Sequence, residues 1–461
     1  MHGVSTICLL LIISLAVACT GRRGSPSGED APTPSVALMT LDPGHFHAAL
    51  VQKDMYPNVN PEVWIYAPEG PELSGHLARI RGYNERGTDP TAWILRVYTG
   101  PDYLNRMLAE RPGNVVVISG NNALKTEYIY STVAAGLNVL ADKPMAIDPE
   151  GFELLRKSFE GAAGRGVLLY DIMTERYEIT SILQKELSLI PEVFGQLLTG
   201  SADEPAVVKE SVHHFFKNVS GSPLVRPAWF FDVRQQGEGI VDVTTHLVDL
   251  IQWACFPEQI INYENEVDIV SARRWATVLT PEQFGRVTGL TSYPDYLAED
   301  IGADSLLRVY SNGEINYRLR GVHARVAVTW EYQAPEGGGD THYSIMRGSL
   351  ANLIIRQGEE QGFVPTLYVE PSGAGGAQLE DALGKALEKL SEAYPGLGYE
   401  GISTGWKLLI PQSYMVGHEA HFAQVTERFL RYLEQGKLPD WEVPNMLAKY
   451  YTTTQAYALS R

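Results

Sequence analysis

The sequence has few cysteines and a shortage of positive charge. Three cysteines occur in 461 residues, too few for a framework of several disulfides. Lys and Arg number 37 against 55 Asp and Glu, which gives a formal net charge of −18. Because nucleic-acid binding depends largely on Lys and Arg that neutralise phosphates, this balance argues against a nucleic-acid partner.

The sequence also lacks an apolar run long enough to span a membrane. Residues 8–18, CLLLIISLAVA, form an apolar run that reaches about half of the roughly 20 residues that a spanning helix needs. The run ends in small residues before Cys19, a pattern that resembles the cleavage site of bacterial lipoproteins. We therefore expect a signal peptide at 1–18, a lipid on Cys19 and a linker at 19–35. A buried N-terminal helix or strand is the alternative.

The expected signal peptide and lipid anchor predict where the protein is located in the cell. An exported chain with a lipid on Cys19 would lie in the cell envelope, as a periplasmic or outer-membrane lipoprotein, and would meet the membrane only through its anchor. Cys8 would be removed with the signal peptide and Cys19 would be acylated. Cys255 would then have no partner for an intrachain disulfide, so stability must come from packing.

The first half of the remaining chain alternates short apolar runs with helical patterns. The runs read as strands buried on both faces, and they lie at 36–41, 62–67, 94–99, 114–119, 138–142 and 166–171. Amphipathic segments such as DYLNRMLAE separate several of them. This alternation predicts a doubly wound parallel sheet, a Rossmann-like domain over residues 36–173 of an α/β protein.

The pattern changes after residue 174. A helix is expected at 179–190, followed by longer strand-like runs with hairpin signals at Asn312-Gly313 and at Gly348. A strongly periodic helix then ends at Gly436. We therefore expect an α+β domain at 174–461 with a mostly antiparallel sheet and C-terminal helices.

Three stretches point to chemistry. ADKPM closes a predicted strand at 141–145, GEGIVDVTTHLVDLIQW opens a helix at 237–253, and LDPGHFHAAL begins the first βα unit at 41–50. In this order and at these distances they resemble the Gfo/Idh/MocA family of NAD(P)-dependent oxidoreductases over about residues 36–460. The resemblance implies a Rossmann domain, NAD or NADP, and a reacting C–O group flanked by Lys143 and His246, with Asp242 contacting sugar or histidine.

The residue types fit that chemistry. On a helix, Asp242 and His246 would project from one face, and a carboxylate beside an imidazole supports proton transfer near neutral pH. Lys143 would stabilise the alkoxide that forms as a carbinol gives up its hydride. The less specific alternatives are a buried core histidine and a lysine that only ends a strand.

The expected dinucleotide loop has one glycine where three are typical. Aligning G-x-G-x-x-G with the sequence places Asp42, Gly44 and His47 at the three positions. Gly44 keeps the role of letting the backbone approach a pyrophosphate, whereas Asp42-Pro43 also reads as a helix N-cap and first turn. The full set of cofactor-binding candidates is Asp42, Gly44, His45, Phe46, Glu69, Asn122 and Lys143.

Other polar and aromatic residues suggest a sugar-sized site. The substrate-binding candidates are Arg176, His213, His214, Trp229 and Arg234. Core packing explains many of the aromatic residues equally well. His342, His418 and His421 raise the question of a metal, but no third ligand lies at close spacing, so no metal site is expected.

Two hypotheses follow. The first is an exported oxidoreductase that acts on a ring hydroxyl of a carbohydrate or glycoside with tightly held NAD or NADP, including a redox-neutral variant that cleaves a glycosidic bond. The second is a non-catalytic envelope protein that binds a glycan or a partner through a degenerate Rossmann domain. A homo-oligomer is compatible with either hypothesis.

Overall fold

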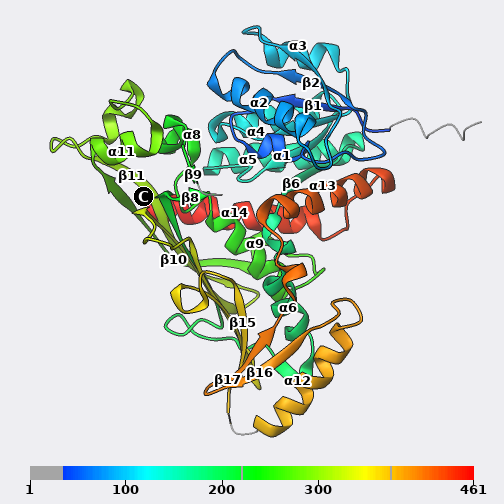
Figure 1. The fold of residues 1–461 in the computed structure, drawn as a ribbon, viewed down its shortest axis with the longest axis vertical. Coiled ribbons are helices and arrows are strands. Elements are labelled where there is room, and N and C mark those ends of the chain that lie inside the picture. Colours follow the sequence, from blue (N-terminus) through cyan, green and yellow to red (C-terminus); the bar gives the residue numbers. More distant parts are fainter. Residues whose placement is uncertain (1–34, 220–221, 374–375) are drawn as a thin grey trace, which may run out of the picture.

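The computed structural model describes residues 35–219, 222–373 and 376–461. The predicted signal peptide, Cys19 and almost all of the linker lie outside these residues. Figure 1 shows two parts, one built on a parallel sheet and one on a larger mixed sheet, with helix α14 (Glu442–Ser460) between them. The predicted order of a Rossmann-like domain followed by an α+β domain is confirmed.

The first sheet has six parallel strands in the order β3-β2-β1-β4-β5-β6. The strands are β1 (Leu38–Leu41), β2 (Glu62–Tyr66), β3 (Ile94–Tyr98), β4 (Val115–Ile118), β5 (Asn138–Asp142) and β6 (Leu169–Ile172). The strand order reverses between β1 and β4, so the crevice outside their carboxyl ends is the expected ligand site.

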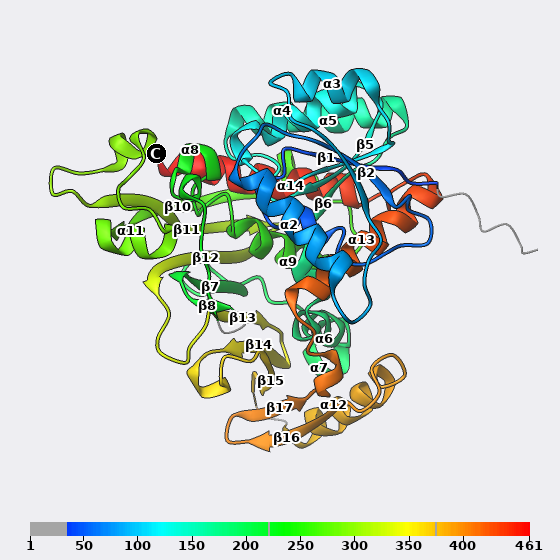
Figure 2. The ribbon, with the colours of Figure 1, turned by 45° about the horizontal axis from the view of Figure 1, so that its top comes forward.

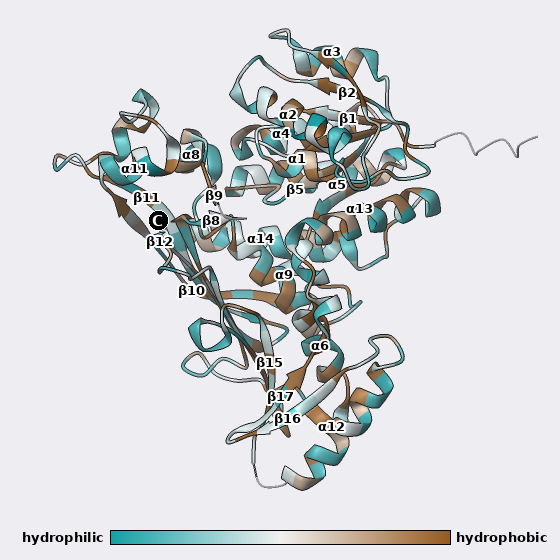
Figure 3. Cartoon of the chain, viewed as in Figure 1, coloured by the Kyte–Doolittle hydropathy of each residue, from teal (hydrophilic) through white to brown (hydrophobic). Residues whose placement is uncertain are grey.

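Helices cover this sheet on both faces, as Figure 2 shows. They are α1 (His47–Leu50), α2 (Pro71–Glu85), α3 (Tyr103–Glu110), α4 (Asn122–Ala134) and α5 (Pro149–Arg165). Strands β1 and β4 are fully buried, as predicted, whereas β3 is an edge strand and leaves Ile94 and Val97 exposed. The prediction that every strand is buried on both faces is therefore wrong for β3. Figure 3 shows the resulting apolar interior as brown strands behind more polar helices.

The second sheet has nine strands in the order β10-β11-β12-β7-β13-β14-β15-β17-β16. All neighbouring pairs are antiparallel except β12 and β7, which are parallel. The strands are β7 (Val207–Phe216), β10 (Val267–Leu279), β11 (Leu307–Leu319), β12 (Val322–Gln333), β13 (Thr341–Arg347), β14 (Ala351–Gln357), β15 (Thr366–Pro371), β16 (Gly398–Ile402) and β17 (Gly405–Leu409). A short separate pair is formed by β8 (Asn218–Val219) and β9 (Ser222–Pro223).

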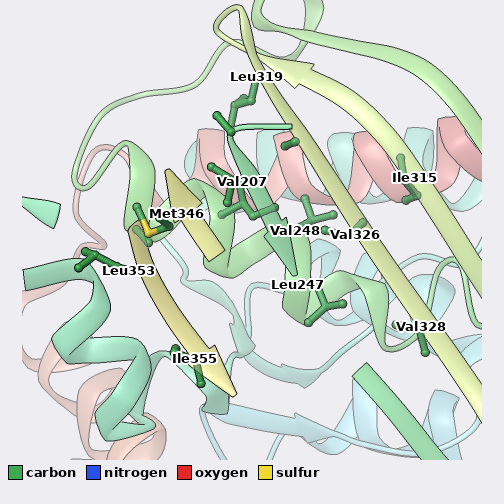
Figure 4. Close-up of a cluster of buried hydrophobic side chains, with 14 of the residues drawn as sticks. Val207, Leu247, Val248, Ile315, Leu319, Val326, Val328, Met346, Leu353 and Ile355 are labelled. Carbon is green, nitrogen blue, oxygen red and sulfur yellow. The ribbon is translucent and has the colours of Figure 1, made fainter. Parts of the chain in front are cut away.

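Helix α9 (Thr244–Cys255) packs on one face of this second sheet. Figure 4 shows Leu247 and Val248 of α9 among Val207 of β7 and Val326 of β12, and all four side chains are buried. The remaining helices are α6 (Ile179–Ser188), α7 (Pro191–Phe194), α8 (Val233–Gln236), α10 (Tyr263–Glu266), α11 (Pro281–Thr288), α12 (Gly376–Leu390), α13 (His418–Gln435) and α14, with 3₁₀ turns η1 (Thr174–Tyr177), η2 (Ala228–Phe231), η3 (Asp295–Asp300), η4 (Glu359–Gln361) and η5 (Gln412–Tyr414).

One predicted hairpin is wrong and the other is confirmed. Asn312-Gly313 lies in the middle of β11 and not in a turn. Position 313 requires glycine because Ile240, in the segment before α9, packs directly against it. A Cβ added to Gly313 would lie 2.5 Å from the Ile240 side chain. Gly348 does separate β13 from β14, so that turn was read correctly.

The C-terminal helices return to the first sheet. Phe422 and Phe429 of α13 join the same buried cluster as Tyr170 of β6, and the rings of Tyr170 and Phe429 stack with centroids 6.1 Å apart. The core of the Rossmann-like domain is therefore closed by residues from the end of the chain. Among the described helices, none is both long and apolar enough to cross a membrane.

Candidate active site

The candidate site lies at the carboxyl end of the parallel sheet, where the start of α9 approaches it. Asp142 is the last residue of β5, and Lys143 follows it before a cis peptide bond to Pro144. Asp242 lies in the turn before α9, not on the helix as predicted, and His246 lies in the first helical turn. Side chains from both domains therefore meet at the edge where doubly wound folds bind ligands.

A glycine fixes the turn that carries Asp242. A Cβ on Gly239 would lie 1.7 Å from the carbonyl oxygen of Ser311 on β11, so no larger residue fits. The Gly239 N–H also donates to the carbonyl of Tyr310 at 3.0 Å. The turn is thus held against the second sheet, which sets the position of Asp242 relative to the first domain.

Lys143 and Asp242 form a buried ion pair. The distance from Lys143 Nζ to Asp242 Oδ1 is 2.7 Å, and Asp242 Oδ2 accepts from Gln236 Nε2 at 3.0 Å. Burial disfavours the charge of Lys143, but the carboxylates of Asp242 and Asp142 outweigh it and raise the pKa of the lysine. The ammonium is therefore charged at neutral pH.

The expected contact between Asp242 and His246 does not form. Among the described residues, Asp242 bonds to Lys143 and Gln236, and His246 Nδ1 is buried without a hydrogen-bond partner. Burial, with the nearby charges of Lys143 and His418, holds the pKa of His246 well below its usual range. His246 is a neutral imidazole with a buried nitrogen that bonds to no described residue.

Sequence reasoning missed Glu175. This residue follows β6 in η1, is partly buried, and lies close enough to Lys143 for the two charges to interact. Burial, together with the neighbouring Glu178, raises the pKa of Glu175 to about 7. A carboxyl group with that pKa can take and return a proton at neutral pH. Its position directly after a strand of the parallel sheet is the signal that could have identified it.

The loop after β1 does not offer the usual pyrophosphate cradle. The N–H of Gly44 donates to Asp42 O at 2.8 Å, and that of His45 donates to Ser119 O at 3.2 Å. The free face of Gly44 lies against the next loop, since a Cβ there would be 3.2 Å from Gly120 Cα. Helix α1 has four residues, too few for a helix terminus that binds phosphate. These residues do not fit a dinucleotide held in the usual way.

Asp42 is not the predicted N-cap. Its backbone φ is 45°, and the N-cap of α1 is Phe46, which makes no side-chain capping bond. The Asp42 carboxylate instead accepts from Tyr128 Oη at 3.0 Å. Burial, with the nearby Glu72, raises the pKa of Asp42. Asp42 therefore does not occupy helix N–H groups, although its carboxylate still brings negative charge to the loop.

His45, His47 and Asp142 form a cluster beside Lys143. His47 Nδ1 lies 2.9 Å and His45 Nδ1 lies 3.6 Å from Asp142 Oδ2. Ser119 Oγ donates to the same oxygen at 3.0 Å. Sequence spacing did not reveal this set, because 95 residues separate His47 from Asp142.

Arg176 belongs to a buried ion network. Its guanidinium donates to both oxygens of Asp249 at 2.7 Å and to Glu442 at 3.1 Å. Lys449 of α14 pairs with Asp249 at 2.9 Å. Each of these donor groups of Arg176 faces a buried carboxylate, which gives the side chain a structural role; substrate binding by Arg176 stays a prediction.

The other substrate candidates lie on the second domain. His213 and His214 share Asp340, at 3.1 Å and 3.2 Å, and the His213 ring stacks on Trp330. Trp229 is half-buried in η2. Arg234 pairs with Asp232 at 2.9 Å and with Asp300 at 2.8 Å, so it ties α8 to η3. Among the described residues, none of these candidates forms a hydrogen bond or an ion pair with the side chain of Lys143.

The two remaining cofactor candidates differ in position. Glu69 is exposed beyond the end of β2, where its carboxylate accepts from Thr99 Oγ1 at 3.4 Å. Asn122 is buried at the start of α4, and its side chain links Gln236 O at 2.6 Å with Lys125 Nζ at 2.5 Å. Asn122 therefore helps to join the two domains next to Lys143.

Comparisons with known proteins agree with this architecture. A family model described as "Putative oxidoreductase C terminal domain" matches residues 183–461. A crystal structure of a "putative oxidoreductase" from Parabacteroides merdae ATCC 43184 is 57% identical, covers 93% of this chain and 98% of its own, and has a TM-score of 0.91. A comparison with curated proteins gave no match.

More distant structures share the fold. A levoglucosan dehydrogenase in complex with NADH and levoglucosan is 12% identical, with a TM-score of 0.57 and coverage of 92% of this chain and 95% of its own. Biliverdin reductase from Synechocystis sp. PCC 6803, in complex with biliverdin and NADP+, is 13% identical, with a TM-score of 0.54 and coverage of 93% and 99%. The chain therefore belongs to the family described as "Putative oxidoreductase C terminal domain", and it shares its two-domain fold with these oxidoreductase structures.

Proposed function

We propose that this chain acts at a ring C–O group, a hydroxyl or the corresponding ketone, of a sugar or glycoside. The observation that carries the proposal is the buried Lys143 ammonium, which Asp242 holds at 2.7 Å beside a neutral His246. An ammonium has three hydrogens, and among the described residues only Asp242 accepts one of them. The others can point to an oxygen of a bound substrate.

The role of Lys143 follows from the negative charge that builds on the substrate oxygen during the reaction. When a carbinol is oxidised, its O–H proton leaves as its C–H hydrogen leaves with the electron pair, and negative charge builds on oxygen. When a ketone loses a neighbouring C–H proton, negative charge builds on the carbonyl oxygen. Lys143 would stabilise the oxyanion in both cases. Glu175, with a pKa near 7, would be the proton acceptor or donor.

NAD or NADP, tightly held, is the hydride carrier that the resemblance predicts, and the levoglucosan dehydrogenase and biliverdin reductase structures contain such nucleotides. The bonded N–H groups of Gly44 and His45 count against the usual pyrophosphate contacts. Nucleotide binding is therefore tested separately, by calorimetric titration of the protein with NAD+, NADH, NADP+ and NADPH. Micromolar affinity supports the redox form of the reaction, and an absence of heat contradicts it.

A panel of sugars, glycosides and keto-sugars in deuterated water tests the reaction itself. Mass spectrometry distinguishes loss of two hydrogens, incorporation of deuterium beside a ketone, and cleavage of a glycosidic bond. The proposal predicts at least one of these products with the wild-type protein. No product from any substrate, with or without nucleotide, would contradict it and favour a glycan-binding protein without catalysis.

A further inference from the structure

The cluster of His45, His47 and Asp142 has the chemistry of a metal site. The ligand atoms of the three residues all lie within 4.8 Å of one another. In a tetrahedral zinc site with bonds of about 2.0–2.2 Å, ligand atoms lie roughly 3.3–3.6 Å apart. The distances of 2.9 Å and 3.6 Å from Asp142 Oδ2 to the two histidine Nδ1 atoms are close to that separation.

We propose that His45, His47 and Asp142 bind a divalent first-row transition metal, with Zn²⁺ the best match to two imidazoles and one carboxylate. Three protein ligands leave a coordination position for water or a substrate oxygen, which is the pattern of reactive rather than structural zinc sites. This inference does not depend on the proposed function, because its ligands are different side chains.

The surroundings support the three ligands. Ser119 Oγ donates to Asp142 Oδ2 at 3.0 Å, an outer contact that orients the carboxylate. The side chains of His47 and Asp142 are 11% and 6% exposed, whereas that of His45 is 26% exposed. The cluster is therefore buried at His47 and Asp142, and it is most accessible to solvent at His45.

The loop is better suited to a cation than to a phosphate. Asp42 and Asp142 bring two carboxylates to this end of β1 and β5, while the N–H groups of Gly44 and His45 are already bonded. His418 adds a further imidazole, with its ring centroid 5.1 Å from that of His47. The positive charges of Lys125 and Lys143 repel a metal cation. Because of this repulsion, we expect the affinity for the metal to depend on all three ligands.

The test is metal binding by protein that carries no polyhistidine tag. After extraction with a chelator, the full chain is titrated with Zn²⁺, Mn²⁺ and Co²⁺ by calorimetry, and the visible absorption of bound Co²⁺ is recorded. The proposal predicts one bound ion per chain and a raised melting temperature, since a metal that binds only the folded chain stabilises it.

Two variants locate the site. His45→Ala removes the most exposed ligand with the least risk to folding, and Asp142→Asn removes the carboxylate charge. Each should weaken binding at least tenfold, because even outer contacts of metal ligands change affinity by about 10- to 100-fold. His323→Ala, on β12 of the second sheet, is the matched control and should bind as the wild type does.

Two outcomes would overturn the proposal, and one supports it even without Asp142→Asn. If no metal binds, the cluster is a hydrogen-bonded pair of His47 and Asp142 with His45 beside it. If metal binds equally to the wild type and to both ligand variants, the metal site lies elsewhere. Binding that is lost in His45→Ala but kept in His323→Ala supports the assignment even if Asp142→Asn fails to fold.

Discussion

Lys143 and Asp242 are 99 residues apart in the chain, and their Nζ and Oδ1 atoms lie 2.7 Å apart. Lys143 directly follows β5 of the parallel sheet, whereas Asp242 belongs to a turn held against the second sheet at Gly239. The ion pair therefore links the two domains, and the position of Lys143 relative to Asp242 depends on how the domains pack.

Asp242→Asn should destabilise the protein. The change leaves a buried ammonium without its charged partner, and breaking a buried pair in this way costs about 3–5 kcal/mol. Asp381→Asn is the control, because Asp381 pairs with Lys385 on the surface, where solvent screens the interaction and its contribution to stability is small. Denaturant unfolding at pH 7 measures both variants. Equal losses of unfolding free energy in the two variants would show that the folded protein does not depend on Asp242 to hold the buried Lys143 ammonium.

Glu175→Gln should remove a pH dependence near neutrality. In the folded chain the pKa of Glu175 is about 7, above the ordinary 4.5, so the folded state binds the proton more strongly than the unfolded state. Its contribution to stability is present below pH 4.5 and is lost as pH rises through 7. Melting temperatures measured from pH 4.5 to 8 should fall less in the variant. Glu153→Gln, on the exposed face of α5, should behave as the wild type does.

In the same variant, the activity profile separates a catalytic from a structural role. If Glu175 transfers the proton, the inflection of kcat/KM near pH 7 disappears in Glu175→Gln and the remaining rate is low. An unchanged inflection, with activity close to that of the wild type, would assign the proton transfer to another group.

Arg176→Ala should lower stability and not substrate affinity. The change leaves Asp249 and Glu442 buried without one of their cations, which costs about 3–5 kcal/mol. Arg308→Ala, whose partner Asp304 is exposed, should leave the unfolding free energy close to that of the wild type, because solvent screens the pair. Denaturant unfolding and KM are measured together. An Arg176→Ala variant of normal stability with a raised KM would instead support the prediction that Arg176 contacts the substrate.

Cys19→Ser tests the predicted export and lipid anchor, which lie outside the described residues. Stable anchoring of a lipoprotein needs more than one acyl chain, so the wild type should fractionate with membranes. The variant should appear in the soluble envelope fraction. Wild-type protein found entirely in a soluble fraction would contradict the lipoprotein prediction.

Much of the first domain could be predicted because its strands are local patterns. Apolar runs such as 115–118 form strands wherever helices cover both faces, and alternation with helices predicts parallel pairing. The edge position of β3 and the mid-strand place of Gly313 could not be predicted, because each depends on which segments pack beside it. Gly313 looks like a turn residue in sequence, but it is a point of close approach to Ile240.

The site was predicted in part for the same reason. Lys143, Asp242 and His246 belong to recognisable motifs, and the structure gathers them in one region. Their partners do not follow from spacing: Asp242 meets Lys143 and not its near neighbour His246. The contact of His47 with Asp142 joins the start of α1 to the end of β5, which no periodic pattern connects.

If Lys143 stabilises an oxyanion on the substrate, Lys143→Met should slow turnover of the best substrate of the panel. Loss of one well-placed charge at a developing oxyanion lowers kcat by about 10²–10³. Lys385→Met, which removes an exposed lysine of α12, is the matched control and should keep wild-type turnover. We expect a loss of that size in folded Lys143→Met; turnover within about threefold of wild type, well short of that loss, would show that the reaction does not need the Lys143 ammonium.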